Sequence, residues 1–191
     1  MVSPWRAGQT VAGGKYRLVR QIGRGSFGDV YLVDELGPGG AVLRQAVLKL
    51  LHPQWAQVTQ VVERFRRESQ ISQLIEHPHV ARVFEHGQLE GGVPFIAMEY
   101  LPGMSLRDRL EQGYLSQAEA LDALIPICEA LAAAHKAGVV HRDLKPENIQ
   151  IIERDGDAFY PVVLDFGVAK LLDAAEKLTM TGALLGTPIY M

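Results

Sequence analysis

A change in the hydrophobic pattern near residues 102 and 103 constrains the fold more than any other feature of this sequence. Before Pro102-Gly103 the apolar residues form short β-branched and aromatic runs, which are typical of strands. After this point they recur at the spacing of a helix face. The sequence therefore predicts a strand-rich first half and a helix-rich second half.

The first half is expected to hold several strands and one helix. Predicted strands cover residues 15–36 (two strands joined by a glycine-rich turn), 46–51, 80–84 and 93–100. Residues 60–75 carry apolar side chains near helical spacing and predict a helix. That helix should end at His77-Pro78, because the residue before a proline is pushed away from helical geometry.

Two serines mark the starts of the predicted helices in the second half. Ser105 is a candidate N-cap for a short helix over residues 105–112. Ser116 and Glu119 have the spacing of a capping box, and the helix they begin should run to about Ala137. Short strands are expected over residues 150–153 and 161–164.

The composition is that of an ordinary globular protein. The 191 residues are 48% hydrophobic and 21% charged, with a formal net charge of -3. This charge gives no electrostatic footprint for nucleic acid or an anionic membrane, so neither is an expected partner. The single cysteine, Cys128, rules out an internal disulfide and fits a reducing compartment. Because it lies in an apolar helical stretch, Cys128 is expected to be buried and inert.

The sequence predicts a cytoplasmic chain with no membrane segment. The N-terminus lacks the basic start and apolar run of a signal peptide. The most apolar window, residues 118–140, is interrupted by charged residues and is not expected to cross a membrane. A membrane anchor beyond residue 191 would lie outside this sequence.

Residues 23–28 have the GxGxxG spacing of a phosphate-binding loop, which alone fits a plain hairpin turn as well. In a dinucleotide-binding fold a helix follows the last glycine. Here the β-branched and aromatic residues 29–33 predict a strand instead. A glycine hairpin can lie against phosphates, because no side chain holds its backbone amides away from the anionic oxygens.

Lys49 stands inside the apolar strand predicted over residues 46–51. An unpaired buried ammonium is costly, so Lys49 is either an edge-strand lysine facing solvent or the partner of an anion. Glu68, on the following helix, is the candidate partner, although by itself it could be one more charge on a solvated helix face.

The segment His141-Arg142-Asp143-Leu144-Lys145-Pro146-Glu147-Asn148 carries the strongest chemical signal. It places a possible base, a cation and an amide oxygen in one short loop. Asp165-Phe166-Gly167 follows at the end of an apolar strand. Carboxylate and amide oxygens, together with substrate phosphates, are the ligands that Mg²⁺ prefers, so Asn148 and Asp165 are candidate metal ligands.

From about Tyr16 to Met191 these motifs follow the order found in the eukaryotic-type (Hanks-type) serine/threonine protein kinases, and the chain resembles the bacterial branch of that family. The resemblance implies an α+β, bilobal protein-kinase-like fold with a strand-rich N-lobe and a helical C-lobe. It divides the chain into an N-terminal extension (1–15), an N-lobe (16–98), a hinge (99–103) and a partial C-lobe (104–191) that ends in the activation and substrate-binding loop.

The resemblance also implies a role for each matching residue. Asp143 would be the catalytic base, Lys145 would contact the γ-phosphate, and Lys49 would hold the α- and β-phosphates while pairing with Glu68. Asn148 and Asp165 would bind Mg²⁺, with Mn²⁺ as an alternative ion. The remaining ATP-binding positions would be Ile22, Gly23, Arg24, Gly25, Ser26, Phe27, Gly28, Val30, Val47, Met98, Glu99 and Leu101.

The implied activity is transfer of the γ-phosphoryl group of Mg·ATP to a serine or threonine of a protein substrate. Thr187 matches the threonine of the family's substrate-binding loop. Thr179 and Thr181 are candidate sites of activation-loop autophosphorylation between two associated copies, because a phosphothreonine could pair with Arg142.

Three departures from the family pattern leave alternatives open. Val47 stands where alanine is usual above the adenine, and Gln150 stands where an apolar residue usually forms the pocket floor. The family's domain continues beyond the position of Met191, so the chain is expected to be a C-terminally incomplete domain. The competing hypotheses are an inactive ATP-binding or interaction module and a small-molecule kinase.

Overall fold

The computed structural model describes residues 5–25 and 27–166, which form two compact units. The first unit contains the described residues up to Gln70 together with Val83–Tyr100. The second contains Ile71–Arg82 together with the described residues from Leu101 onward. The N-lobe was predicted to cover residues 16–98, but residues 71–82 belong to the second unit.

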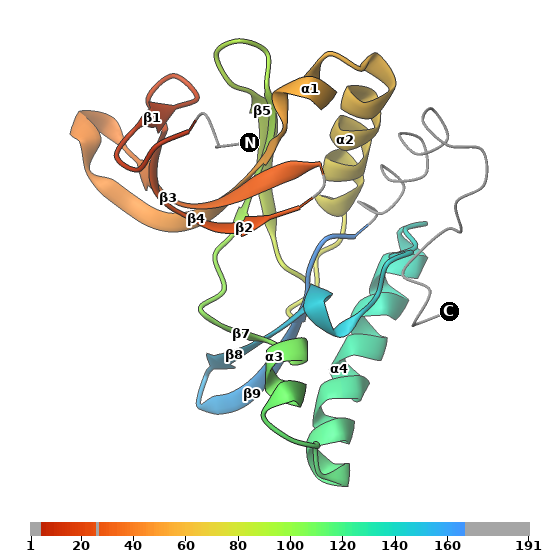
Figure 1. Ribbon diagram of the computed structural model, residues 1–191. Coiled ribbons are helices and arrows are strands. Elements are labelled where there is room, and N and C mark those ends of the chain that lie inside the picture. Colours follow the sequence, from red (N-terminus) through yellow and green to blue (C-terminus); the bar gives the residue numbers. More distant parts are fainter. Residues whose placement is uncertain (1–4, 26, 167–191) are drawn as a thin grey trace. The chain divides into compact units, whose positions relative to one another are not determined.

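The first unit is built on a six-stranded antiparallel sheet with the order β1-β2-β3-β4-β6-β5 (Figure 1). The strands are β1 (Thr10–Val11), β2 (Tyr16–Arg24), β3 (Gly28–Leu36), β4 (Val42–Leu51), β5 (Val83–Gln88) and β6 (Pro94–Glu99). A short 3₁₀ turn, η1 (Pro38–Gly40), joins β3 to β4. The expected strand at 80–84 was misplaced, because Val80 instead forms an isolated parallel bridge with Val163.

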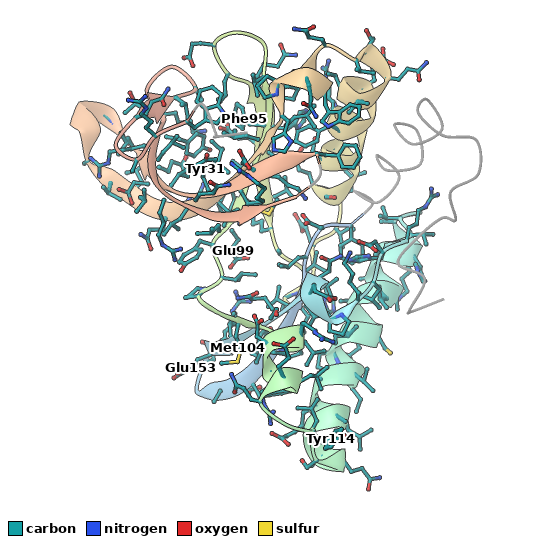
Figure 2. All side chains as sticks on the ribbon, in the orientation of Figure 1. Tyr31, Phe95, Glu99, Met104, Tyr114 and Glu153 are labelled. Carbon is teal, nitrogen blue, oxygen red and sulfur yellow. The ribbon has the colours of Figure 1, made fainter. Side chains whose placement is uncertain are left out.

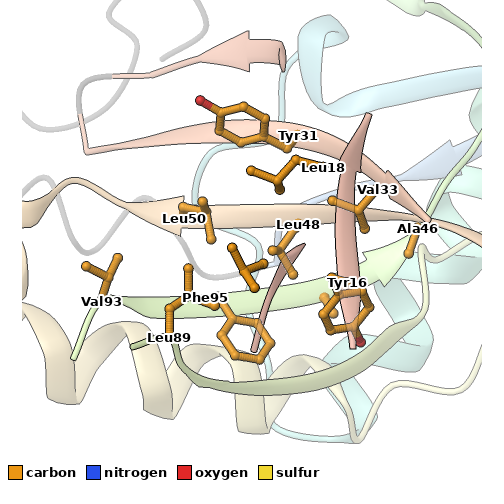
Figure 3. Close-up of a cluster of buried hydrophobic side chains, with 12 residues drawn as sticks. Tyr16, Leu18, Tyr31, Val33, Ala46, Leu48, Leu50, Leu89, Val93 and Phe95 are labelled. Atoms are coloured by element: carbon orange, nitrogen blue, oxygen red, sulfur yellow. The ribbon is translucent and has the colours of Figure 1, made fainter. Parts of the chain in front are cut away.

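Side chains from one face of this sheet form the hydrophobic core shown in Figure 3. Tyr31 and Val33 of β3, and Leu48 and Leu50 of β4, are all buried there. Each pair is two residues apart, as expected for side chains on the same face of a strand. Two helices, α1 (Pro53–Ala56) and α2 (Thr59–Ser72), follow β4 in the chain. The four-residue α1 was not predicted.

The second unit combines a three-stranded antiparallel sheet with two helices. Its strands are β7 (Gly103–Ser105), β8 (Ile149–Arg154) and β9 (Asp157–Val163), in the order β7-β8-β9. The helices are α3 (Leu106–Glu111) and α4 (Gln117–Lys136), and a 3₁₀ turn, η2 (Pro146–Asn148), precedes β8. Both predicted N-caps are confirmed, since Ser105 and Ser116 each form a complete capping box, with Asp108 and Glu119.

Helix α4 packs on β9 through one narrow face. That face consists of Ala123, Ile127, Ala130 and Ala134, which are buried. The prediction that Cys128 is buried was wrong: the thiol is exposed. A step of one residue turns about 100° around a helix, so Cys128 falls beside the face that Ile127 buries. None of the described helices is long and apolar enough to span a membrane.

A buried tyrosine hydroxyl ties β2 to β5 inside the first unit. The Tyr16 hydroxyl donates to Glu85 Oε1 at 2.8 Å, and Lys15 Nζ lies 2.7 Å from Glu85 Oε2. Partial burial opposes ionisation of Glu85, but the hydrogen bonds from Lys15 and Tyr16 lower its pKa below the ordinary value of 4.5. Burial raises the pKa of Tyr16, so its hydroxyl stays a donor at physiological pH.

We expect Tyr16→Phe to destabilise the protein by about 1–2 kcal/mol at pH 7, because Glu85 loses a charge-assisted hydrogen bond. A lowered carboxyl pKa contributes stability above the ordinary pKa and loses it as the pH falls through the folded-state value. The difference between wild type and Tyr16→Phe should therefore shrink as the pH is lowered below about 4.5. Urea unfolding at several pH values measures it.

Tyr114→Phe is the matched control for the loss of a hydroxyl. Tyr114 is fully exposed in the loop between α3 and α4 (Figure 2), so its variant should unfold like the wild type at every pH. A Tyr16→Phe variant as stable as Tyr114→Phe at pH 7 would contradict the role given to the Tyr16–Glu85 bond.

Candidate functional site

The glycine-rich segment is a tight hairpin between β2 and β3. The Gly25 amide donates to the Gly28 carbonyl at 2.8 Å and closes the turn. Gly28 lies so close to β4 that a Cβ atom there would overlap the Leu50 carbonyl oxygen. A glycine is therefore required at residue 28 by the approach of a neighbouring strand, whereas a Cβ at Gly25 would meet only ordinary contacts.

Strand register places several predicted ATP-binding residues on one face of the first sheet. Val30 pairs with Lys49, and Val47 pairs with Met98. Directly paired residues share a face, and residues two apart on a strand also share it. These four side chains therefore lie on the face opposite the core of Figure 3.

The other predicted residues of the first unit lie on or beside the same strands. Ile22 and Gly23 belong to β2, where Gly23 pairs with Val30, and Glu99 ends β6. Glu68 lies on α2, but its side chain is outside the part of the structure that can be described. Ser26 also lies outside the described residues.

His141 is a buried anchor of the second unit. Only 2% of its surface is exposed, and its ring packs on Phe166 with centroids 4.8 Å apart. Its Nε2 lies 2.8 Å from the Leu164 carbonyl oxygen, and its Nδ1 accepts from the Asp143 amide at 3.3 Å. These partners require the neutral tautomer with the proton on Nε2. Burial lowers the pKa of His141, against the opposing effects of the Leu164 carbonyl and nearby Asp165 and Asp143.

Asp143 is held by two donors from its own loop. Lys145 Nζ lies 2.7 Å from Asp143 Oδ2. The Asn148 side-chain nitrogen donates to the Asp143 carbonyl at 2.8 Å and to Asp143 Oδ2 at 3.2 Å. The carboxylate is only 16% exposed, so these donors fix it in one orientation.

Backbone hydrogen bonds hold Leu164, the residue directly before Asp165, against this loop. The Leu164 amide donates to the Asn148 carbonyl at 2.9 Å, while the Leu164 carbonyl meets His141. Asp165 has a positive φ of 54°, and Arg142 has one of 67°. Residues other than glycine adopt this conformation at an energetic cost, but Ala12 and Asp155, which have no predicted role, adopt it too.

The side-chain nitrogen of Asn148 is used to hold Asp143, which leaves its oxygen as the ligand atom for a cation. Asn148 and Asp165 each carry an oxygen atom of the kind that a hard cation such as Mg²⁺ prefers. Among residues 5–25 and 27–166, no group of three or more His, Cys, Asp or Glu side chains could hold a metal ion by protein ligands alone.

Gln150 makes a contact that sequence reasoning did not anticipate. Its side-chain nitrogen donates to the carbonyl of Leu101 at 3.3 Å, within the second unit. Leu101 was predicted to be an ATP-binding position within the hinge (99–103), so the polar side chain of Gln150 is tied to the predicted hinge. Thr179, Thr181 and Thr187 lie outside the described residues.

No role was predicted for Asp29 or Leu164. Asp29 is a buried acid directly after the last glycine of the hairpin, and an acid at the start of an apolar strand is a signal that could have been read. Leu164 acts through its backbone, which no pattern of side chains reveals.

Comparison with known proteins places the chain in a family. The family model described as a protein kinase domain matches residues 16–191. The chain belongs to the protein kinase family. The serine/threonine-protein kinase Pkn1 of Myxococcus xanthus is 39% identical to this kinase chain over 178 residues, which are 93% of the chain and 25% of Pkn1. The probable serine/threonine-protein kinase pknA2 of Bifidobacterium longum is 41% identical over 184 residues, 93% of the chain and 23% of pknA2.

Solved structures support the same assignment. A crystal structure of the PknI kinase domain of Mycobacterium tuberculosis matches with a TM-score of 0.71 and 29% identity, covering 90% of the kinase chain and 67% of that chain. The kinase-like fold expected from the sequence is thereby confirmed. The kinase chain spans about a quarter of the length of the two curated relatives.

We expect Gly28→Ala to destabilise the kinase chain by about 1–3 kcal/mol, because the new methyl group forces β3 away from β4. Gly25→Ala, in the same hairpin, should change stability by less than about 0.5 kcal/mol. Urea unfolding of both variants measures the difference. Equal stabilities would show that the approach of β4 does not require glycine at residue 28.

Proposed function

We propose that this chain is the catalytic part of a protein serine/threonine kinase, which transfers the γ-phosphoryl group of Mg·ATP to a serine or threonine hydroxyl of a protein. The observation that carries the proposal is the fixed Asp143 carboxylate, held by Lys145 and Asn148 in one loop. In the reaction the hydroxyl oxygen bonds to the γ-phosphorus, the bond to the bridging oxygen breaks, and ADP leaves.

Asp143 is proposed as the base that orients the substrate hydroxyl and accepts its proton. Its position between two donors supports this role, because a base must point at the proton it receives. Lys145, 2.7 Å from Asp143, brings a positive charge next to that carboxylate, where it can neutralise the γ-phosphate as charge develops. Positioning and charge neutralisation supply most of the catalysis in phosphoryl transfer.

The metal ligands are proposed to be Asn148 and Asp165. The engaged nitrogen of Asn148 supports its role, and the Leu164 backbone bonds fix the start of the Asp165 segment beside the same loop. A bound Mg²⁺ would neutralise phosphate charge there, and Mn²⁺ is the expected substitute. The ion's identity is part of the proposal.

The nucleotide is proposed to lie against the sheet face that carries Val30, Val47, Lys49 and Met98. Their shared face supports this placement, since it gathers an apolar surface and one cation. Lys49 would hold the α- and β-phosphates and pair with Glu68. The backbone of the glycine hairpin would cover the phosphates, while Glu99 and Leu101 would receive the adenine edge.

Regulation is proposed to act through Thr179 and Thr181, phosphorylated by a second copy of the kinase, with Thr187 in the substrate-binding loop. Arg142, next to Asp143, supports this view, because it could pair with a phosphothreonine. The proposed location is the cytoplasm, and nucleic acid is not a proposed partner. The competing function, an inactive ATP-binding module, keeps nucleotide binding but lacks transfer.

We expect Asp143→Asn to retain ATP binding and to lose phosphoryl transfer by about 10²–10⁴-fold, because the amide cannot accept the hydroxyl proton. Transfer of radiolabelled phosphate from Mg·ATP in the full-length protein measures the loss. Asp122→Asn, which removes an exposed carboxylate from α4, is the matched control and should retain full activity. Near-wild-type transfer by Asp143→Asn would remove Asp143 from the mechanism, and no transfer by wild type would favour the inactive module.

We also expect incubation with Mg·ATP to phosphorylate Thr179 and Thr181, at a rate per molecule that rises with protein concentration if the reaction occurs between copies. Phosphopeptide mapping by mass spectrometry identifies the sites. Phosphorylation only elsewhere, with a fully active Thr179→Ala/Thr181→Ala variant, would contradict the switch.

A further inference from the structure

A buried carboxylate sits at the base of the glycine hairpin. Asp29 is 3% exposed and accepts hydrogen bonds from Gln21 Nε2 at 2.9 Å and from Arg24 Nε at 2.7 Å. Arg24 Nη2 is 3.4 Å from Asp29 Oδ2. His52 Nε2 lies 3.4 Å from Asp29 Oδ1. Burying a carboxylate is costly unless it is paired, and here three side chains surround it.

The partners of Asp29 come from the first strand of the hairpin and from a segment outside the hairpin. Gln21 and Arg24 belong to β2, where Arg24 is the cross-strand partner of Asp29. His52 directly precedes α1, after the end of β4. The carboxylate therefore connects the strand that enters the hairpin, the strand that leaves it and the segment that follows the neighbouring strand.

The tip of the hairpin is fixed to that same segment. The His52 amide donates to the Phe27 carbonyl at 2.7 Å. The Phe27 ring packs against Trp55 of α1 with centroids 5.2 Å apart. His52 thus contacts the hairpin twice, through its ring at Asp29 and through its backbone at Phe27.

Strand alternation shows which way the Arg24 side chain is held. Asp29 and Tyr31 share the face of the sheet that carries the hydrophobic core, and Val30 faces the other way. Because Arg24 pairs directly with Asp29, its guanidinium is drawn away from the face of Val30 and Lys49. The proposed phosphate contacts are then left to backbone amides of the hairpin.

We propose that Asp29 is a positioning residue for the nucleotide, which holds the glycine hairpin in its binding shape through Arg24, Gln21 and His52. This inference rests on the proposed kinase function and extends it to a residue that would not touch the substrate. A hairpin that is ordered before binding loses less conformational entropy when the nucleotide arrives. The network should therefore act on ATP affinity and leave the chemical step unchanged.

The test compares two ion pairs that join the same two strands. Asp34 pairs across the sheet with Arg17 at 2.7 Å, as Asp29 does with Arg24, but the Asp34 pair lies at the far end of β3. Asp29→Asn keeps the size of the side chain and removes its charge, and Asp34→Asn is the matched control. Mg·ATP binding by calorimetry, KM for ATP, kcat and thermal stability are measured for each full-length protein.

We expect Asp29→Asn to raise the Kd and the KM for Mg·ATP by about 3–10-fold with little change in kcat. Arg24→Gln should do the same, and Arg24→Lys, which restores one charged donor, should fall between Arg24→Gln and wild type. Asp34→Asn should change the Kd less than 2-fold, as expected for a partly exposed ion pair away from the site. If Asp29→Asn does not fold, the two Arg24 variants decide the matter, since that side chain is exposed.

Three results would overturn the inference. Unchanged or tighter ATP binding by Asp29→Asn, together with weaker binding by Arg24→Gln, would make Arg24 a direct phosphate ligand rather than part of a network. Equal weakening by Asp29→Asn and Asp34→Asn would reduce both pairs to general stabilisers of the sheet. A wild-type protein that binds no Mg·ATP would overturn the proposed function as well, whereas the other two results leave that function intact.

Discussion

The contact between the buried His141 ring and the Leu164 carbonyl is the constraint on which the candidate site of the second unit depends. A neutral imidazole can donate from Nε2 and accept at Nδ1 at the same time, so His141 binds the end of one segment and the start of another. The Leu164 amide closes the arrangement on Asn148. As a result the His141 ring holds the backbone of Asp143 and of the residue before Asp165, while Lys145 and Asn148 hold the Asp143 carboxylate.

In the first unit, too, neighbouring groups hold the residues of the candidate site in place. Its glycine hairpin is shaped by a strand that comes too close to Gly28 for any side chain, and by the buried Asp29 network. In both units the residues with proposed chemical roles depend on neighbours with none. Charged side chains can act on phosphate only where other groups already hold them, because ordering them at the moment of reaction would add to the barrier.

Much of the candidate site could be predicted from the sequence, because its residues lie in short motifs whose order is specific. Helix starts at Ser105 and Ser116 were also predictable, since capping depends on residues three positions apart. The strand expected at 80–84 was misplaced because a tertiary contact, Val80 with Val163, decides its start. Cys128 was expected to be buried because apolar composition does not tell which face of α4 is covered. Asp29 was missed for a similar reason, since its partners are brought together only by folding.

The ionisation state of His141 tests the central claim most directly. Nitrogen-15 NMR of the histidine rings, followed from pH 8 to pH 5, distinguishes the two neutral tautomers from the charged ring. We predict a neutral His141 with its proton on Nε2, and ionisation only below the ordinary histidine pKa of 6.5, because burial lowers its pKa. A histidine whose pKa is lowered by folding contributes stability at pH values above its ordinary pKa of 6.5. This contribution is lost as the pH falls from 6.5 through the folded-state pKa. A proton on Nδ1, or a charged His141 at pH 7, would contradict the account.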